Sequence, residues 1–205
     1  MKKLLIILAL GNFVSISSFA QEKYTTYYSS YFDKDYEIDV SFKDNKLGLY
    51  IDLAGLDRLR ETGGISINDK SYDGFMENLQ FARSKYEEWI KVAIENDVRD
   101  LTKDVELKTE VITGYFVSGG EYTFDFSVRP SFDFKILDDE KGLRHLLIFR
   151  TGELESSSNR YITASDFVMV FSSLEEMDEF IELISKEKLN EFKNKTSDKS
   201  SLFKN

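Results

Sequence analysis

The chain has 205 residues and a formal net charge of −10, with 37 acidic residues against 27 basic ones. It contains no cysteine and a single histidine. This composition excludes disulfides, cysteine nucleophiles and the usual ligand sets for zinc, copper, haem and iron–sulfur clusters, so we expect no cofactor. The acidic balance disfavours nucleic acid as a partner and is compatible with a basic one.

The first twenty residues have the pattern of a secretory signal peptide. Two lysines precede an apolar run over residues 4–10, and the small residues Ser18 and Ala20 are typical of a signal-peptidase site. The apolar run is far shorter than the roughly 20 residues of a membrane span. We therefore expect residues 1–20 to be removed, leaving an exported protein, periplasmic or secreted, with no integral membrane segment.

Residues 21–34 are rich in tyrosine, which fits either an extended arm or an edge strand. Aromatic side chains on such a segment can dock a sugar or a partner protein. Tyr27, Tyr28 and Tyr31 are therefore candidate ligand-binding residues.

Residues 33–39, DKDYEID, carry an acidic residue at every second position. A helical calcium loop needs a tight turn at its sixth position, and here that position is the β-branched Ile38. The alternation of acids with Tyr36, Ile38 and Val40 instead predicts a strand with one buried face. A weak cation site on Asp33, Asp35 and Glu37 remains as an alternative.

Turn chemistry over residues 43–46 predicts a hairpin to a second strand, in which Leu47, Leu49, Ile51 and Leu53 are buried. Gly63 and Gly64 lack the lysine and hydroxyl residues of a phosphate loop and predict a turn.

Residues 72–98 form the clearest predicted helix, because apolar side chains recur there at three- and four-residue steps. Ser71 or Asp73 is suited to cap its start. Trp89, the single tryptophan, lies inside the apolar stripe; it is a further candidate for ligand stacking, although the stripe favours a core role. The stretch EWIKVAIENDV, followed by Lys103 and an alternating strand, resembles uncharacterised small secreted bacterial proteins. That resemblance implies no chemistry.

Several strands are predicted after this helix, over residues 105–117, 122–128, 132–136, 143–149 and 166–171. Tyr122, Phe124, Phe126 and Val128 are expected to share one core face. Pro130 ends their strand. Residues 143–149 are apolar on both faces and are expected to be central in the sheet. Residues 151–159 read as an exposed polar loop.

A capping box at Ser173 and Glu176 predicts the start of a last helix, over residues 173–192, followed by a polar tail over 193–205. The run DFVMVF-SSLEEMDEFIELI also resembles the close of a pleckstrin-homology-like barrel, whose last strand leads to a capping helix. The periodicities together predict one α+β domain over residues 35–192, with a mostly antiparallel sheet or roll of six to eight strands packed against the helices 72–98 and 173–192.

The sequence offers little catalytic machinery. His145 is the one histidine, and no G-x-S-x-G turn accompanies it, so a structural or surface role is favoured. We predict no catalytic residue and a non-catalytic binding or envelope-associated module with an unidentified ligand or protein partner. Two alternatives remain open. One is a glycosidase-like hydrolase, for which two acids roughly 5 to 10 Å apart suffice. The other is an inhibitor or immunity-like protein whose acidic surface neutralises a basic partner.

Overall fold

The computed structural model describes residues 22–57, 62–108 and 111–201. The predicted signal peptide, residues 1–20, lies outside the described residues. The described residues form thirteen strands and three helices. The strands are β1 (Glu22–Ser29), β2 (Lys34–Lys43), β3 (Lys46–Asp52), β4 (Ala54–Gly55), β5 (Gly63–Asn68), β6 (Leu101–Val105), β7 (Ile112–Ser118), β8 (Glu121–Val128), β9 (Ser131–Asp139), β10 (Gly142–Arg150), β11 (Leu154–Glu155), β12 (Thr163–Ala164) and β13 (Phe167–Phe171). The helices are α1 (Tyr72–Glu95), α2 (Leu174–Leu183) and α3 (Lys186–Ser201).

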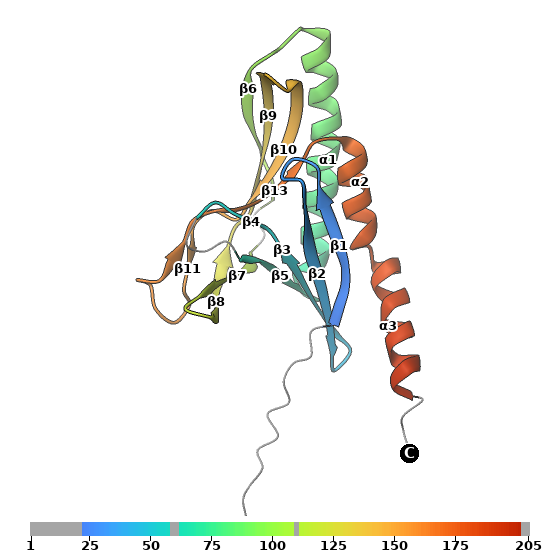
Figure 1. The fold of residues 1–205 in the computed structure, drawn as a ribbon. Helices are drawn as coiled ribbons and strands as arrows, with labels where there is room; N and C mark the ends of the chain where they lie inside the picture. Colours follow the sequence, from blue (N-terminus) through green and yellow to red (C-terminus); the bar gives the residue numbers. More distant parts are fainter. Residues whose placement is uncertain (1–21, 58–61, 109–110, 202–205) are drawn as a thin grey trace, which may run out of the picture.

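The α+β class with antiparallel sheets is confirmed, but the strands form two large sheets. One sheet has six strands in the order β1-β2-β3-β5-β7-β8, and the other has five in the order β4-β13-β10-β9-β6. β11 and β12 form a short two-stranded ribbon. The five-stranded sheet lies beside the long α1, and α2 and α3 follow one another along the β1 side of the six-stranded sheet (Figure 1). Buried residues of both sheets and of the helices form one hydrophobic cluster.

The first hairpin has the predicted alternation. Tyr36, Ile38 and Val40 are buried on β2, whereas the acids between them are exposed or half-buried. Asp44 and Asn45 join β2 to β3 with positive φ values of 51° and 62°, the combination that a tight hairpin turn requires. The segment DKDYEID is therefore mostly the start of a strand, and residues 22–29 are an edge strand paired with it.

Three local expectations are corrected. Gly63 and Gly64 begin β5 instead of forming a turn, and glycine is required there because the Phe167 ring and the Ile51 carbonyl leave no room for a side chain. Residues 151–159 are not a fully exposed loop: Leu154 is buried against Gly114. Ser71 precedes α1, yet its side chain makes no capping hydrogen bond and instead bonds Asn68.

The segment predicted as one helix over 173–192 is divided in two. Ser173 accepts a hydrogen bond from the Glu176 amide at 3.1 Å, as the capping box predicts, but α2 ends at Leu183. The hydroxyls of Tyr24 and Tyr72 donate to the carbonyls of Leu183 and Ile184, each at 2.7 Å, and satisfy the end of the helix. α3 then continues to Ser201, through much of the predicted polar tail.

Candidate functional site

One face of the six-stranded sheet points away from the hydrophobic core. Cross-strand pairs place Asp52 opposite Gly64, Gly64 opposite Tyr115, and Tyr115 opposite Phe124. Directly opposed residues point to the same side of an antiparallel sheet, so these positions form a row across four strands. We call this side the outer face and define it by Glu37, Asp39, Tyr50, Asp52, Tyr115, Tyr122, Phe124 and Phe126.

A tyrosine and a carboxylate are joined across the middle of the outer face. The Tyr115 hydroxyl donates to Asp52 Oδ1 at 2.6 Å. A side chain at Gly64, between them, would meet the Tyr115 hydroxyl at 2.9 Å and the Ile51 carbonyl oxygen at 2.0 Å. The glycine therefore allows the Tyr115 ring to cross from β7 to β3.

The acidic half of the outer face consists of Glu37, Asp39 and Asp52, whose negative charges repel one another. Burial raises the pKa of Asp52 in spite of the hydrogen bond from Tyr115, and the negative charges of Asp39 and Glu37 raise it further. Burial, followed by the charge of Glu37, also raises the pKa of Asp39. Lys23 forms an ion pair with Glu37. A further positive charge brought to this half would favour the ionised forms.

The aromatic half of the outer face contradicts the prediction that these rings share a core face. Tyr122 and Phe126 are 62% and 63% exposed. The Phe124 and Phe126 rings are nearly parallel, with centroids 6.4 Å apart and an interplanar angle of 4°. A register irregularity between Ile112 and Gly114 turns Val128 inward, while the rings before it point outward.

A groove runs beside the same sheet, between β1 and α2, and two of the predicted ligand-binding residues line it. Its volume is about 430 Å³. We call it the β1 groove; it is lined by Thr26, Tyr27, Tyr28, Ser30, Asp35, Ser172, Ser173, Glu175, Glu176, Glu179 and Leu183. Tyr27 is buried, whereas Tyr28 is 52% exposed.

The other two predicted ligand-binding residues lie elsewhere. Tyr31 is beneath the Arg144 guanidinium, 5.6 Å from its ring centroid. Trp89 is half-buried on α1, where its ring packs 5.7 Å from that of Phe134 and carries the Lys103 ammonium 4.3 Å from its centroid. The structure therefore does not bring Trp89 together with the tyrosines.

The three acids proposed for a weak cation site have separate surroundings. Asp33 accepts a hydrogen bond from the Tyr28 hydroxyl at 2.6 Å. Glu37 pairs with Lys23 on the outer face, and Asp35 lines the β1 groove. Within residues 22–57, 62–108 and 111–201, no group of three or more acidic, histidine or cysteine side chains has a geometry that could hold a metal ion.

His145 has surroundings that fit the predicted structural role. Its ring lies parallel to Phe134, with centroids 6.3 Å apart, and burial lowers its pKa. In the part of the chain that the structure describes, its buried Nε2 atom has no hydrogen-bond partner. The neutral ring is therefore favoured at this position.

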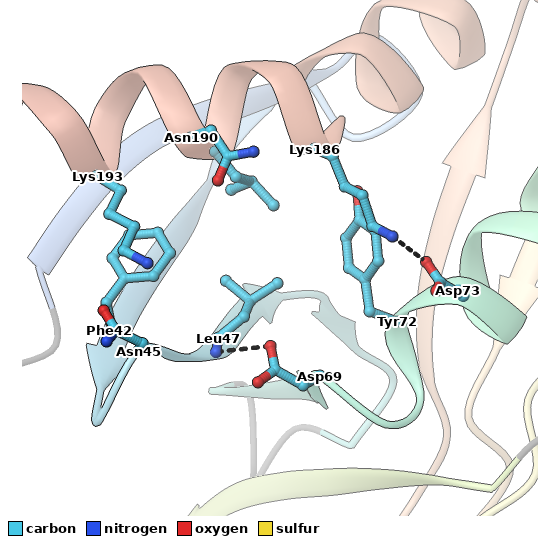
Figure 2. A pocket seen from close by; sticks show the side chains of 10 residues that line it. Phe42, Asn45, Leu47, Asp69, Tyr72, Asp73, Lys186, Asn190 and Lys193 are labelled. Carbon is cyan, nitrogen blue, oxygen red and sulfur yellow. Dashed lines mark hydrogen bonds and ion pairs between the residues drawn. The ribbon is translucent and has the colours of Figure 1, made fainter.

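A second hollow, of about 270 Å³, lies between α3 and the β2–β3 hairpin (Figure 2). We call it the α3 hollow; it is lined by Phe42, Asn45, Leu47, Asp69, Tyr72, Asp73, Lys186, Leu189, Asn190 and Lys193. Lys186 pairs with Asp73 at 2.7 Å, and Asp69 accepts from the Leu47 amide at 2.8 Å. The Lys193 ammonium lies 5.4 Å from the centroid of the Phe42 ring. Lys186 thus attaches α3 to α1, Lys193 attaches α3 to β2, and Asp69 fixes the start of β3.

Comparison with protein-family models, curated proteins and solved structures finds no match, so the class of protein is defined by its own fold and surfaces. In the described residues, no helix has both the length and the apolarity needed to cross a bilayer. Polar and aromatic groups gather on the outer face and in the β1 groove, as they also do in the α3 hollow. The predicted candidates Tyr27 and Tyr28 both line the β1 groove, whereas the outer face was not predicted, because the alternation of β8 gave the wrong side.

Proposed function

We propose that this is an exported, non-catalytic binding protein that recognises a basic protein partner through the outer face. The observation that carries the proposal is the juxtaposition of exposed rings, Tyr122 and Phe126, with the carboxylates of Asp39 and Asp52 on one sheet face. Export rests on the signal-like pattern of the first twenty residues.

The chemistry of the outer face suits lysine and arginine side chains. A cation over an aromatic ring gains about 0.5–2 kcal/mol, depending on how far it is desolvated. The same cation relieves the repulsion that raises the pKa of Asp39 and Asp52. The net charge of −10 adds long-range attraction for a basic partner and accelerates encounter at low salt.

The hydrolase alternative is less well supported than binding. A glycosidase needs two acids that face each other across a bound sugar, one of them kept protonated. The outer face instead places Glu37, Asp39 and Asp52 side by side on neighbouring strands. The Tyr115 hydroxyl also donates a hydrogen bond to Asp52. We therefore favour a partner that rests on the sheet over a substrate that is cleaved there.

The test uses an oligolysine peptide as the probe and removes rings instead of charges. A Tyr122→Ala, Phe126→Ala double variant leaves the net charge unchanged, so a general attraction between opposite charges is preserved. We expect its affinity for oligolysine to fall about tenfold, equivalent to about 1.4 kcal/mol. Phe81→Ala is the matched control, because Phe81 is 43% exposed on α1, away from the outer face.

Two results would count against the proposal. Equal affinities of the double variant and the parent would show that binding of oligolysine depends on overall charge and not on the exposed rings. Tighter binding of a neutral oligosaccharide than of oligolysine, or release of new reducing ends from it, would favour the glycan-binding or the hydrolase alternative. Titration calorimetry at low and high salt, with a reducing-sugar assay on the same samples, distinguishes these outcomes.

A further inference from the structure

Within the described residues, the two edges of the six-stranded sheet differ in whether other segments cover them. At the β8 edge, the Ser157 amide donates to the Phe124 carbonyl at 2.7 Å, and the Glu155 amide donates to Asp125 at 2.9 Å. The segment around β11 thus covers that edge. At the β1 edge, no strand of the described part of the chain pairs with the outward side of β1.

The usual protection of an edge strand is confined to one end of β1. Lysine, proline and bulges are the common devices that prevent a free edge from pairing with another chain. Lys23 and the register irregularity between Lys23 and Thr25 protect the first part of the strand. From Thr25 to Ser29 the sequence TTYYS has none of these devices, and this part borders the β1 groove.

α2 lines the β1 groove with unpaired acids. Glu175, Glu179 and Leu183 follow one another at four-residue steps, so they lie on one side of the helix, while Met177 and Phe180 are buried on the other. In the described chain, neither Glu175 nor Glu179 makes an ion pair or a hydrogen bond. The two carboxylates therefore border the groove with uncompensated negative charge.

Two further polar residues form part of this wall, Glu176 and Tyr27. Glu176 accepts from the amides of Ser30 at 2.8 Å and Ser172 at 2.6 Å, which fixes α2 against the end of β1. Tyr27 is 3% exposed, and its buried hydroxyl lies near the Glu176 carboxylate.

We infer that the β1 groove binds an extended, lysine- or arginine-containing segment of a partner protein, which adds to the sheet as a new strand beside β1. The backbone of residues 25–29 supplies main-chain hydrogen bonds, the usual source of affinity when a peptide extends a sheet edge. Glu175 and Glu179 lie on the far wall, where they pair with the basic side chains of the segment. This surface borders the outer face, since Asp35 lies two residues from Glu37 on β2, but it depends on β1 and α2 and not on the rings of β8, so either proposal can fail without the other.

The first test uses three peptides of alternating lysine and valine. One is unmodified, and each of the others is N-methylated at every second amide, along one edge or along the opposite edge. Strand addition requires one peptide edge, so we expect one methylated peptide to lose at least about tenfold in affinity. In ¹⁵N-labelled protein, the amides of residues 25–29 should shift and exchange more slowly with solvent when the unmodified peptide is bound. Equal binding of all three peptides would overturn the inference, because ion pairing alone does not depend on the peptide backbone.

The second test changes the acids of α2. Glu175→Gln with Glu179→Gln should weaken the unmodified peptide about tenfold, whereas Glu140→Gln with Glu153→Gln, an equal change of charge at exposed sites elsewhere, should not. Equal affinities of these two variants would overturn the inference. The Tyr122→Ala, Phe126→Ala variant should bind the unmodified peptide at β1 with the affinity of the parent. This result is therefore distinguishable from the outcome for the outer face. Denaturation midpoints of all variants confirm that each one is folded.

Discussion

The β1 groove and the α3 hollow both lie between a helix and the six-stranded sheet. They differ in whether the charged side chains that line them have partners within the described chain. In the hollow, Lys186 pairs with Asp73 and Asp69 holds the Leu47 amide. In the groove, Glu175 and Glu179 have no such partners in the described chain. The comparison teaches that a hollow alone does not mark a binding site. Where the chain satisfies its own polar groups the hollow joins two elements, and where it does not, the groups are available to a partner.

The largest expected effect comes from the packing that supports the groove. Phe180 is 1% exposed, and its ring contacts those of Tyr27 and Phe171 at centroid distances of 5.2 and 5.6 Å. Phe180→Ala should lower the free energy of unfolding by about 3–5 kcal/mol and abolish peptide binding at β1. Urea denaturation measures the first effect, with the exposed Phe81→Ala as control, expected within about 0.5 kcal/mol of the parent. A loss below about 1 kcal/mol would mean that α2 is not packed as described.

A smaller effect is expected at the wall of the hollow. Tyr72→Phe removes the hydroxyl that donates to the Ile184 carbonyl, in a buried position, at 2.7 Å. Leaving that carbonyl unsatisfied should cost about 1–3 kcal/mol and speed amide exchange in α3. Tyr24→Phe removes the equivalent, less buried bond to Leu183 and should cost less. The reverse order of the two variants would contradict the assignment of the α2 end.

The charges of the α3 hollow and of the β1 groove should have different roles, the first in stability and the second in binding. The Lys186–Asp73 pair is well exposed, with side chains 66% and 71% accessible, so Lys186→Met should change the free energy of unfolding by no more than about 1 kcal/mol. It should leave peptide affinity at β1 unchanged. Glu179→Gln, in the groove, should do the opposite, with weaker binding and unaltered stability. If both variants act on stability alone, the contrast between the two hollows is not functional.

The smallest effects are in the pH dependence of stability, and their signs differ. The raised pKa of Asp52 means that the folded state binds this proton more tightly than the unfolded state. Its contribution is fully present below the ordinary value of 3.8 and is lost as the pH rises through the folded-state pKa. Hydrogen bonding to Arg83 lowers the pKa of Asp178, so that contribution is present above 3.8 and is lost on acidification. Denaturation of Asp52→Asn and Asp178→Asn across this range should therefore give slopes that differ from the parent in opposite directions.

The parts of the fold that depend on local pattern were predictable from the sequence. The period-two alternation around Ile38 and the turn at Asp44 and Asn45 indicated the first hairpin, because both are properties of a few consecutive residues. The capping box at Ser173 likewise indicated where α2 begins.

The remaining features depend on residues that are distant in the chain. The break after Leu183 is stabilised by the hydroxyls of Tyr24 and Tyr72, more than a hundred positions away. The outward rings of β8 follow from an irregularity in its pairing with β7, which alternation within β8 does not reveal. The acids of α2 were recognisable as a polar helix face, but nothing in their spacing shows that β1 lies beside them.

The glycine at position 64 has a consequence for how this surface can evolve. Any side chain there would collide with the Ile51 carbonyl and displace Tyr115, so the centre of the sheet admits no gradual substitution. Tyr122 and Phe126, at the rim, face no such obstacle. Descendants of this sequence that change partners are therefore expected to alter the rim and keep the glycine, so that new specificity arises at the margin of an inherited scaffold.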